Sequence, residues 1–144
     1  MGLAAIRDSN PFRVPIRHSR ASVLGCPVDN LTMGETVSLA VDAMKTGRPI
    51  RQVSLNVAKL VNMRSDSVLH SDVITSDIIN ADGAGILLAG RCTGFRLKER
   101  VAGIDLFYEL LKICADEGFR PFFLGATAEV LRDAIRNART KFPS

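Results

Sequence analysis

Three short polar or glycine-rich stretches hold the residue types that could do chemistry: SLN at 54–56, NADGAG at 80–85 and LGAT at 124–127. Each one includes or follows the end of an apolar run of strand length. In open α/β sheets, ligands bind beyond the carboxyl ends of the strands, beside the helices that follow. If these strands are parallel, the three stretches should therefore converge on one ligand site.

Asp82, in the middle stretch, has two interpretations. An aspartate at a helix N-terminus is stabilised as the anion by about 0.3–1 kcal/mol, so a helix cap would account for it without catalysis. The same stabilisation weakens it as a proton acceptor, whereas burial beside a substrate acts in the opposite direction. The residues alone leave both the cap and the catalytic base open.

The other residues of these stretches also have structural alternatives. Ser54 and Asn56 are common helix caps. Gly83 and Gly85 form a lone G-x-G, which is weak evidence for phosphate binding without the rest of a dinucleotide pattern. Gly125 suits a tight turn as well as a nucleotide contact. It is their combination at one predicted edge that favours a binding site.

Arg100 precedes Val-Ala-Gly103, and a guanidinium there would suit a phosphate or carboxylate. A surface pair with Glu99 is the structural alternative. The chain has no D-x-D pair, no Ser-His-Asp or Cys-His constellation, and only two histidines. Its three cysteines are scattered without a C-x-x-C, so we expect buried or idle thiols and no metal site.

Short β-like runs alternate with helical patterns from residue 22 onward. Strands are expected within 22–29, 50–56, 77–82 and 119–126. Helices are expected after a capping box at Thr32–Glu35 and within 57–66, 67–77, 83–92, 103–118 and 128–142. This order predicts a Rossmann-like α/β fold with a parallel sheet and helices on both faces. The sheet would be incomplete, because the last helix is not followed by another strand.

Composition indicates one soluble globular domain, with 47% hydrophobic and 24% charged residues in 144. Residues 1–20 carry four arginines and one aspartate, hence +3 of the net charge of +4. The nearly neutral remainder disfavours a nucleic-acid-binding face. We expect a flexible basic leader at 1–21, solvated or in contact with anionic lipid, and a folded domain at 22–144. No apolar run reaches the roughly 18 residues of a membrane span, and no signal-peptide pattern is visible, so a cytoplasmic location is expected.

Five segments in order resemble the bacterial WecG/TagA/CpsF family of glycosyltransferases: VLGCPVDNLTMGETV, SLNVAKLV, NADGAGILLAG, ERVAGIDL and FFLGAT. The resemblance implies an inverting enzyme that needs no metal or cofactor and works at the cytoplasmic side of a membrane. It would transfer N-acetylmannosamine, glucose or a related hexose from a UDP donor to a polyprenyl-diphosphate-linked acceptor. Its products would be cell-surface polysaccharides such as teichoic acid, common antigen or exopolysaccharide.

The same resemblance suggests roles for the site residues. Asp82 matches the proposed catalytic base. Ser54, the second expected catalytic residue, stands where the family has a threonine near the sugar, keeping the hydroxyl. Asn56 matches a family asparagine. Independently of the resemblance, we expect Arg100 or the loop amides at Gly83 and Gly125 to stabilise negative charge on the pyrophosphate. The residues expected to bind substrate are Asn56, Gly83, Gly85, Arg100 and Gly125.

Family members are longer, and the part beyond this chain is expected to hold further strands, UDP contacts and a membrane-binding appendage. The chain would then be the N-terminal portion of such an enzyme. The alternative is a non-catalytic module that self-associates or pairs with another chain through its unfinished sheet. A dinucleotide-binding enzyme is a weaker option, since VDNLTMGE at 28–35 lacks the glycine fingerprint.

Overall fold

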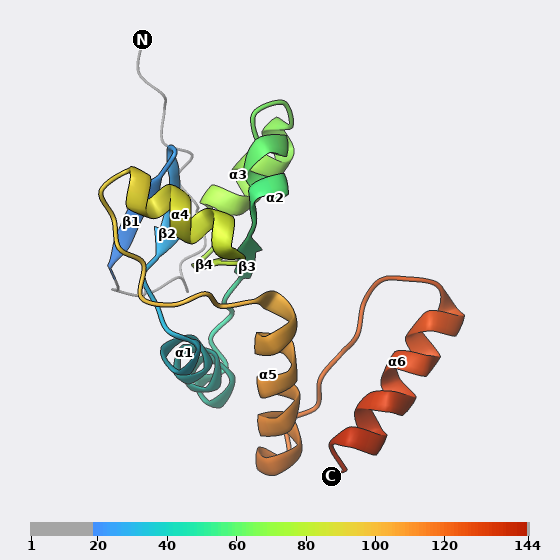
Figure 1. Cartoon of the computed structure of the whole chain (residues 1–144). Coiled ribbons are helices and arrows are strands. Elements are labelled where there is room, and N and C mark those ends of the chain that lie inside the picture. Colours follow the sequence, from blue (N-terminus) through green and yellow to red (C-terminus); the bar gives the residue numbers. More distant parts are fainter. Residues whose placement is uncertain (1–18, 144) are drawn as a thin grey trace.

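The computed structural model describes residues 19–143, which form four short strands and six helices (Figure 1). The strands are β1 (Arg20–Val23), β2 (Cys26–Asp29), β3 (Gln52–Leu55) and β4 (Ile78–Ala81). The helices are α1 (Met33–Thr46), α2 (Val57–Asn62), α3 (Ser67–Ile74), α4 (Ala84–Cys92), α5 (Gly103–Glu117) and α6 (Ala128–Lys141). The first described strand begins at Arg20, two residues before the expected domain boundary at residue 22. Most of the expected flexible leader lies outside the described residues.

Two small sheets carry the fold. β1 and β2 form an antiparallel hairpin whose turn residues, Leu24 and Gly25, both have positive φ, as a two-residue type I′ turn requires. β3 and β4 are parallel, with Ser54 opposite Asn80. The crossover between them is helical, through α2 and α3. This is the incomplete Rossmann-like α/β arrangement that the sequence predicts.

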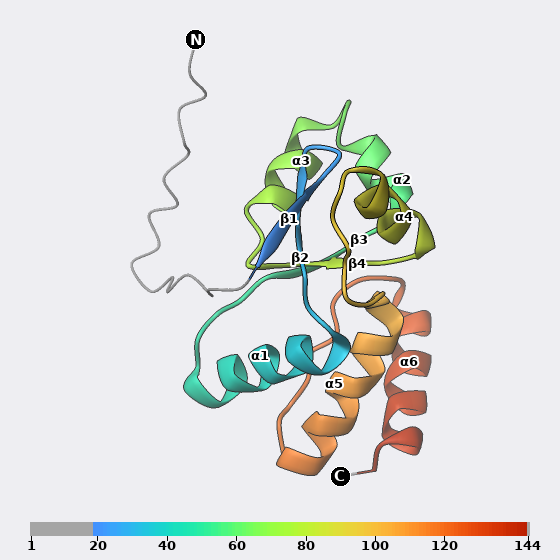
Figure 2. The same ribbon diagram turned by 60° about the vertical axis from the view of Figure 1, so that its left-hand side comes forward.

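The two faces of the β3–β4 sheet differ in character because successive side chains on a strand point to opposite sides. One face contributes Val53, Leu55, Ile79 and Ala81 to an apolar cluster shared with the hairpin, α2, α3 and α4. The other face carries Gln52, Ser54, Ile78 and Asn80. Both views of the ribbon place α1 and α5 on that side, away from α2–α4 (Figures 1 and 2).

Asp29 joins the hairpin to β4. It is 1% exposed, and its carboxylate accepts hydrogen bonds from Arg20 Nε and from the Ile79 N–H, both at 2.6 Å. Arg20 Nη2 also donates to the carbonyls of Ser76 and Asp77 at 3.0 and 2.8 Å. A buried carboxylate needs such partners to offset its lost hydration. The result is a fixed position for β4 beside β2.

The expected capping box begins α1. Thr32 Oγ1 accepts from the Glu35 N–H at 3.2 Å, and Glu35 Oε2 accepts from the Thr32 N–H at 2.7 Å. The helix ends at Gly47, whose φ of +66° makes the left-handed C-cap. The buried side chains of α1 are Thr36 and Ala43, while the apolar residues at 37, 40, 41 and 44 are only partly buried. The helix thus packs through a polar residue on the polar face of the sheet.

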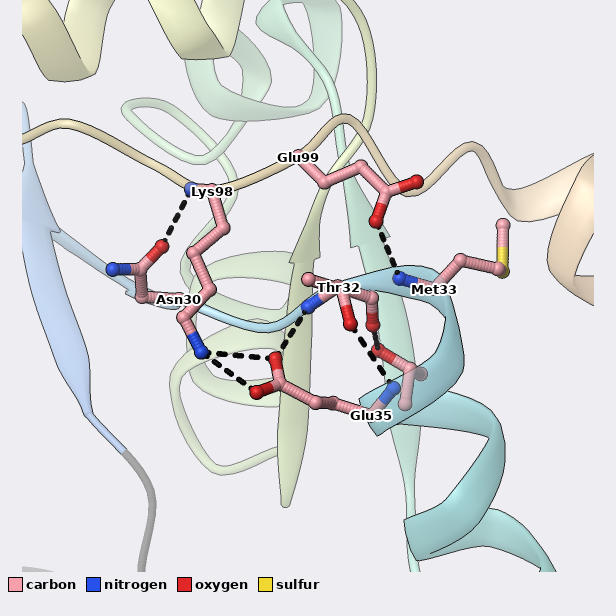
Figure 3. A network of polar contacts seen from close by, with 7 residues as sticks. Asn30, Thr32, Met33, Glu35, Lys98 and Glu99 are labelled. Carbon is pink, nitrogen blue, oxygen red and sulfur yellow. Dashed lines mark hydrogen bonds and ion pairs between the residues drawn. The ribbon is translucent and has the colours of Figure 1, made fainter.

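A loop from distant sequence binds this helix start (Figure 3). The Lys98 ammonium contacts both Glu35 carboxylate oxygens at 2.7 and 3.0 Å, and the Lys98 N–H donates to Asn30 Oδ1 at 2.7 Å. Glu99 accepts from the Met33 N–H at 2.9 Å. The Lys98 bond, and then the Thr32 N–H, hold the pKa of Glu35 below its ordinary value of 4.5. This attachment is therefore complete above pH 4.5 and weakens as the pH falls through the lowered value.

The strand expected at 119–126 is wrong. These residues run as coil, with Phe122 87% and Leu124 91% exposed. An apolar run becomes a strand only when a partner supplies ladder hydrogen bonds, and neither described sheet includes this segment. The α6 helix that follows forms as expected but buries no residue. A groove of about 570 Å³ separates it from α5 and is lined by residues such as Leu111, Phe123 and Ile135.

None of the helices within residues 19–143 is both long and apolar enough to cross a bilayer.

We predict that Asp29→Ala lowers the free energy of unfolding by about 3 kcal/mol, because it removes the carboxylate partner of Arg20 and leaves the Ile79 N–H buried and unbonded. Urea unfolding followed by circular dichroism measures the change. Asp42→Ala, at an exposed position on α1, is the control and should change stability by less than about 0.5 kcal/mol. Equal losses in the two variants would contradict the role of Asp29.

Candidate active site

Two of the three predicted stretches meet where β3 and β4 end. Asp82 follows β4 directly, and its N–H donates to the Leu55 carbonyl at 2.8 Å, which continues the parallel ladder. A Cβ built on Gly103 would lie 2.8 Å from Ser54 Oγ and 4.0 Å from Asp82 Oδ2. Ser54, Asp82 and Gly103 therefore lie close together at this edge.

The loop before α5 extends the edge. The Val101 N–H donates to the Ala81 carbonyl at 2.9 Å, and Val101 and Ala102 are both buried. Since a Cβ at position 103 would come within 2.8 Å of Ser54 Oγ, only glycine lets the first turn of α5 approach β3 this closely. Figure 1 shows this turn directly next to the paired strands.

Two helices begin at this edge without a side-chain cap. Gly83 precedes α4 and Ala102 precedes α5, and neither supplies a capping hydrogen bond from a side chain. The first N–H groups of a helix have no acceptor within the helix, so they are available to an anion. The arrangement can thus bind a negatively charged group such as a phosphate beside Ser54 and Asp82.

Asp82 is not a helix cap. The N-cap of α4 is Gly83, with a φ of +97°, and Asp82 lies one residue before it. Its side chain is partly buried, and within residues 19–143 its carboxylate takes part in no hydrogen bond or ion pair. The cap interpretation of Asp82 is therefore wrong, and its carboxylate stays available to a ligand.

Ser54 and Asn56 are both held by neighbouring residues. Ser54 Oγ accepts from Gln52 Nε2 at 3.1 Å, and its carbonyl accepts from Lys59 Nζ at 2.8 Å. Asn56 caps α2, because its Oδ1 accepts from the Lys59 N–H at 2.8 Å. The cap uses the amide oxygen of Asn56, so its amide nitrogen is left for the predicted substrate contact.

Gly83 and Gly85 each have a steric reason to be glycine. The positive φ of Gly83 makes the sharp turn from β4 into α4. A Cβ on Gly85 would lie 2.4 Å from Val57 Cγ2, so this glycine allows α4 to pack on α2. Their roles in substrate binding stay predictions.

Arg100 lies in the loop just before α5. Its Nη2 is 3.4 Å from Asp105 Oδ2, and both side chains are about half exposed (54% and 55%). The expected alternative, a surface pair with Glu99, is wrong because Glu99 binds the start of α1 instead. A weak, exposed pair with Asp105 leaves the guanidinium able to turn to an anionic ligand.

Gly125 does not join this edge. The predicted convergence required a strand at 119–126, and the coil found there pairs with neither β3 nor β4. Gly125 has a φ of +117°, and no atom lies within 4 Å of a Cβ built on it. The convergence of three stretches is thus corrected to two, and nothing in the described structure supports a substrate contact at Gly125.

Two positions at the site escaped the sequence-based prediction. Gly103 was visible only as part of the ERVAG motif, without a role. Gln52 stands two residues before Ser54, and this period-2 spacing places both on the same strand face. That spacing was the available signal for Gln52.

Residues 19–143 contain no group of three or more His, Cys, Asp or Glu side chains that could hold a metal ion. The prediction of a metal-independent site stays a prediction. Burial raises the pKa of the Cys26 thiol to about 11, against a smaller opposing effect of Arg20, and burial also raises the pKa of Cys114. Neither thiol is activated as a nucleophile.

Residues 21–144 match the model of the glycosyl transferase WecG/TagA/CpsF family. Relatives named N-acetylglucosaminyldiphosphoundecaprenol N-acetyl-beta-D-mannosaminyltransferase are similar to this chain. The protein from Bacillus spizizenii is 35% identical over 82 residues, and the one from Bacillus subtilis is 34% identical over 76 residues. The Staphylococcus aureus protein (strain NCTC 8325) is 29% identical over 129 residues.

These matches cover 57%, 52% and 88% of this chain, but only 30%, 30% and 50% of the respective relatives. The chain thus spans about half the length, or less, of the curated relatives that it matches. The family match, by contrast, extends over nearly all of the chain, including β3, β4 and the loop to α5. The chain therefore belongs to the WecG/TagA/CpsF family of glycosyl transferases.

Proposed function

We propose that this chain supplies the catalytic edge of an inverting hexosyltransferase in cell-surface polysaccharide synthesis. The donor would be a UDP-sugar carrying N-acetylmannosamine, glucose or a related hexose, and the acceptor a polyprenyl-diphosphate-linked sugar. One observation carries the proposal: Ser54 and Asp82 lie close to Gly103 at the end of the strands, where α4 and α5 begin without a side-chain cap. The names of the relatives, which state transfer of N-acetylmannosamine to a diphosphoundecaprenol-linked sugar, support the substrate class.

In this proposal Asp82 is the general base. Its carboxylate accepts the proton of the acceptor hydroxyl, the oxygen attacks the anomeric carbon of the donor sugar, and the bond to the diphosphate oxygen breaks. Attack from the side opposite to the leaving group inverts the anomeric centre. Because the Asp82 carboxylate takes part in no hydrogen bond within residues 19–143, it is available to the acceptor hydroxyl.

The leaving diphosphate gains negative charge as the bond breaks. N–H groups at the starts of α4 and α5 would stabilise this charge without reorganising, and the Arg100 guanidinium would add a mobile positive charge. Gly83 and Gly85 would contribute through their backbone, and Asn56 and Ser54 would contact the sugar or its phosphates. No step in this scheme calls for a metal ion.

The lipid-linked acceptor would bring the protein to the cytoplasmic face of a membrane as a peripheral protein. The basic residues near the N-terminus would favour an anionic surface, each by about 1 kcal/mol close to the headgroups.

A second candidate function is a non-catalytic module that pairs with another chain or with itself. The exposed Phe122 and Leu124 and the open groove between α5 and α6 favour it. Light scattering separates the two candidates, because a monomer at high concentration would count against self-association.

We predict that Asp82→Asn lowers the transfer rate by about 100-fold or more, because the amide cannot accept the acceptor's proton. The assay measures UDP release from UDP-hexoses in the presence of a polyprenyl-diphosphate-linked N-acetylglucosamine. Asp116→Asn, at an exposed position near the other end of α5, is the matched control and should retain full activity. Equal rates for the wild type and Asp82→Asn would remove Asp82 as the base. No UDP release by the wild type with any donor would contradict the proposal for this chain.

Gly103→Ala should lower the transfer rate by about 10- to 100-fold, since the added methyl group pushes the first turn of α5 away from Ser54. The same clash should reduce the free energy of unfolding by about 1–3 kcal/mol. Gly34→Ala is the control: it is also in a first helical turn, but its Cβ would meet no atom within 4 Å. That variant should be as stable as the wild type or slightly more stable. Full activity of Gly103→Ala would show that the close approach is not needed.

A further inference from the structure

A chain of side-chain hydrogen bonds crosses the polar face of the sheet and ends at Ser54. Thr36 Oγ1 lies 2.9 Å from the Thr32 carbonyl oxygen, and Asn80 Nδ2 lies 2.9 Å from Thr36 Oγ1. Gln52 Nε2 lies 2.9 Å from Asn80 Oδ1 and 3.1 Å from Ser54 Oγ. The chain thus connects the start of α1 with the candidate active site.

The hydrogen bond between Thr36 and the Thr32 carbonyl fixes the direction of every other hydrogen bond in this series. A carbonyl oxygen can only accept, so the Thr36 hydroxyl must donate its single proton to Thr32. Thr36 Oγ1 can then only accept from Asn80, which turns the amide nitrogen of Asn80 toward Thr36 and its oxygen toward Gln52. Thr36 and Asn80 are 1% and 0% exposed, so water does not compete for these bonds.

The same logic extends to Ser54. The amide nitrogen of Gln52 has two N–H groups, and one is used by Asn80 Oδ1. The second donates to Ser54 Oγ, so the serine oxygen is an acceptor on that side and its own proton must point elsewhere. Within residues 19–143 no acceptor takes this proton. The Ser54 hydroxyl is therefore free to donate to a ligand that binds beside Gly103 and Asp82.

We propose that Gln52 is a positioning residue: it holds Ser54 Oγ as an acceptor, so that the Ser54 hydroxyl donates to an oxygen atom of the bound sugar nucleotide. The identity of that ligand rests on the proposed function. The orientation of the Ser54 hydroxyl does not rest on the proposed function, because it follows from the series of side-chain hydrogen bonds from Thr36 to Ser54. A glutamate or a leucine at position 52 has no side-chain N–H to donate, so the Ser54 hydroxyl would no longer be held in this orientation.

The orientation is tested without any enzymatic activity by the thiol that Ser54→Cys introduces. A thiolate accepts hydrogen bonds, so the Gln52 N–H should lower the pKa of this thiol. Adding Gln52→Leu should raise that pKa by about one pH unit. The measurement is the rate of alkylation by iodoacetamide against pH, followed by mass spectrometry of the peptide that contains position 54.

Exposed Cys92, in the same sample, is the internal control, and its alkylation profile should be identical in both variants. Gln52→Met, of nearly the same length as glutamine, repeats the test if the leucine variant fails to fold. Gln52 is itself an exposed side chain, so one of the two folded variants is expected. An unchanged thiol pKa in a folded variant would overturn the proposal.

Transfer kinetics give the second readout. Gln52→Leu and Gln52→Glu should both lower kcat by about tenfold while leaving KM for the lipid-linked acceptor unchanged. Thr36→Ser, which keeps the hydroxyl that sets the direction of the chain, should retain the wild-type kcat. Wild-type kcat in both Gln52 variants would overturn the proposal. If the wild type transfers no sugar, the proposed function fails, and the thiol measurement still decides the role of Gln52.

Discussion

The hydrogen bonds that the buried Asp29 carboxylate accepts from Arg20 and from the Ile79 N–H hold β4 in place between the hairpin and β3. Everything at the candidate site depends on this position, because the register of β4 decides which side chains face which way. With Ile79 turned to the apolar cluster, Asn80 must face α1 and Ala81 must face the cluster again. The strand then ends, and Asp82 leaves the ladder at the edge where α4 and α5 begin.

The family motif around residues 99–103 acquires a physical meaning from this arrangement. Glu99 binds the start of α1, and the Val101 N–H bonds to the last residue of β4. Gly103 then allows α5 to begin against Ser54. The motif thus attaches one loop to two separate elements and brings a helix N-terminus to the site. Its glycine is a packing requirement, which explains why a glycine rather than a polar side chain stands beside the reacting groups.

Local signals predicted most of the elements correctly. The capping box at Thr32 and the glycines at 47 and 118 act within one helical turn, so the sequence alone indicates where α1 begins and where α1 and α5 end. Two of the three failures involve long-range partners. The apolar run at 119–126 has the pattern of a strand but no strand to pair with among the described residues. Aspartate is a common helix cap, but Gly83, with its positive φ, is the N-cap of α4, and Asp82 lies one residue before it. Gln52 gains its role only through the buried amide of Asn80, 28 residues away in the chain.

The central claim is that the uncapped starts of α4 and α5 form one anion site beside Ser54 and Asp82. The most direct test is a titration of the isotope-labelled chain with UDP, followed through its backbone amide resonances by NMR. Our account predicts that the amides of Ala84, Gly85, Gly103 and Ile104 shift together with a single dissociation constant, while those of α6 stay unchanged. Saturable binding of UDP that shifts other amides and leaves these four unchanged would contradict it.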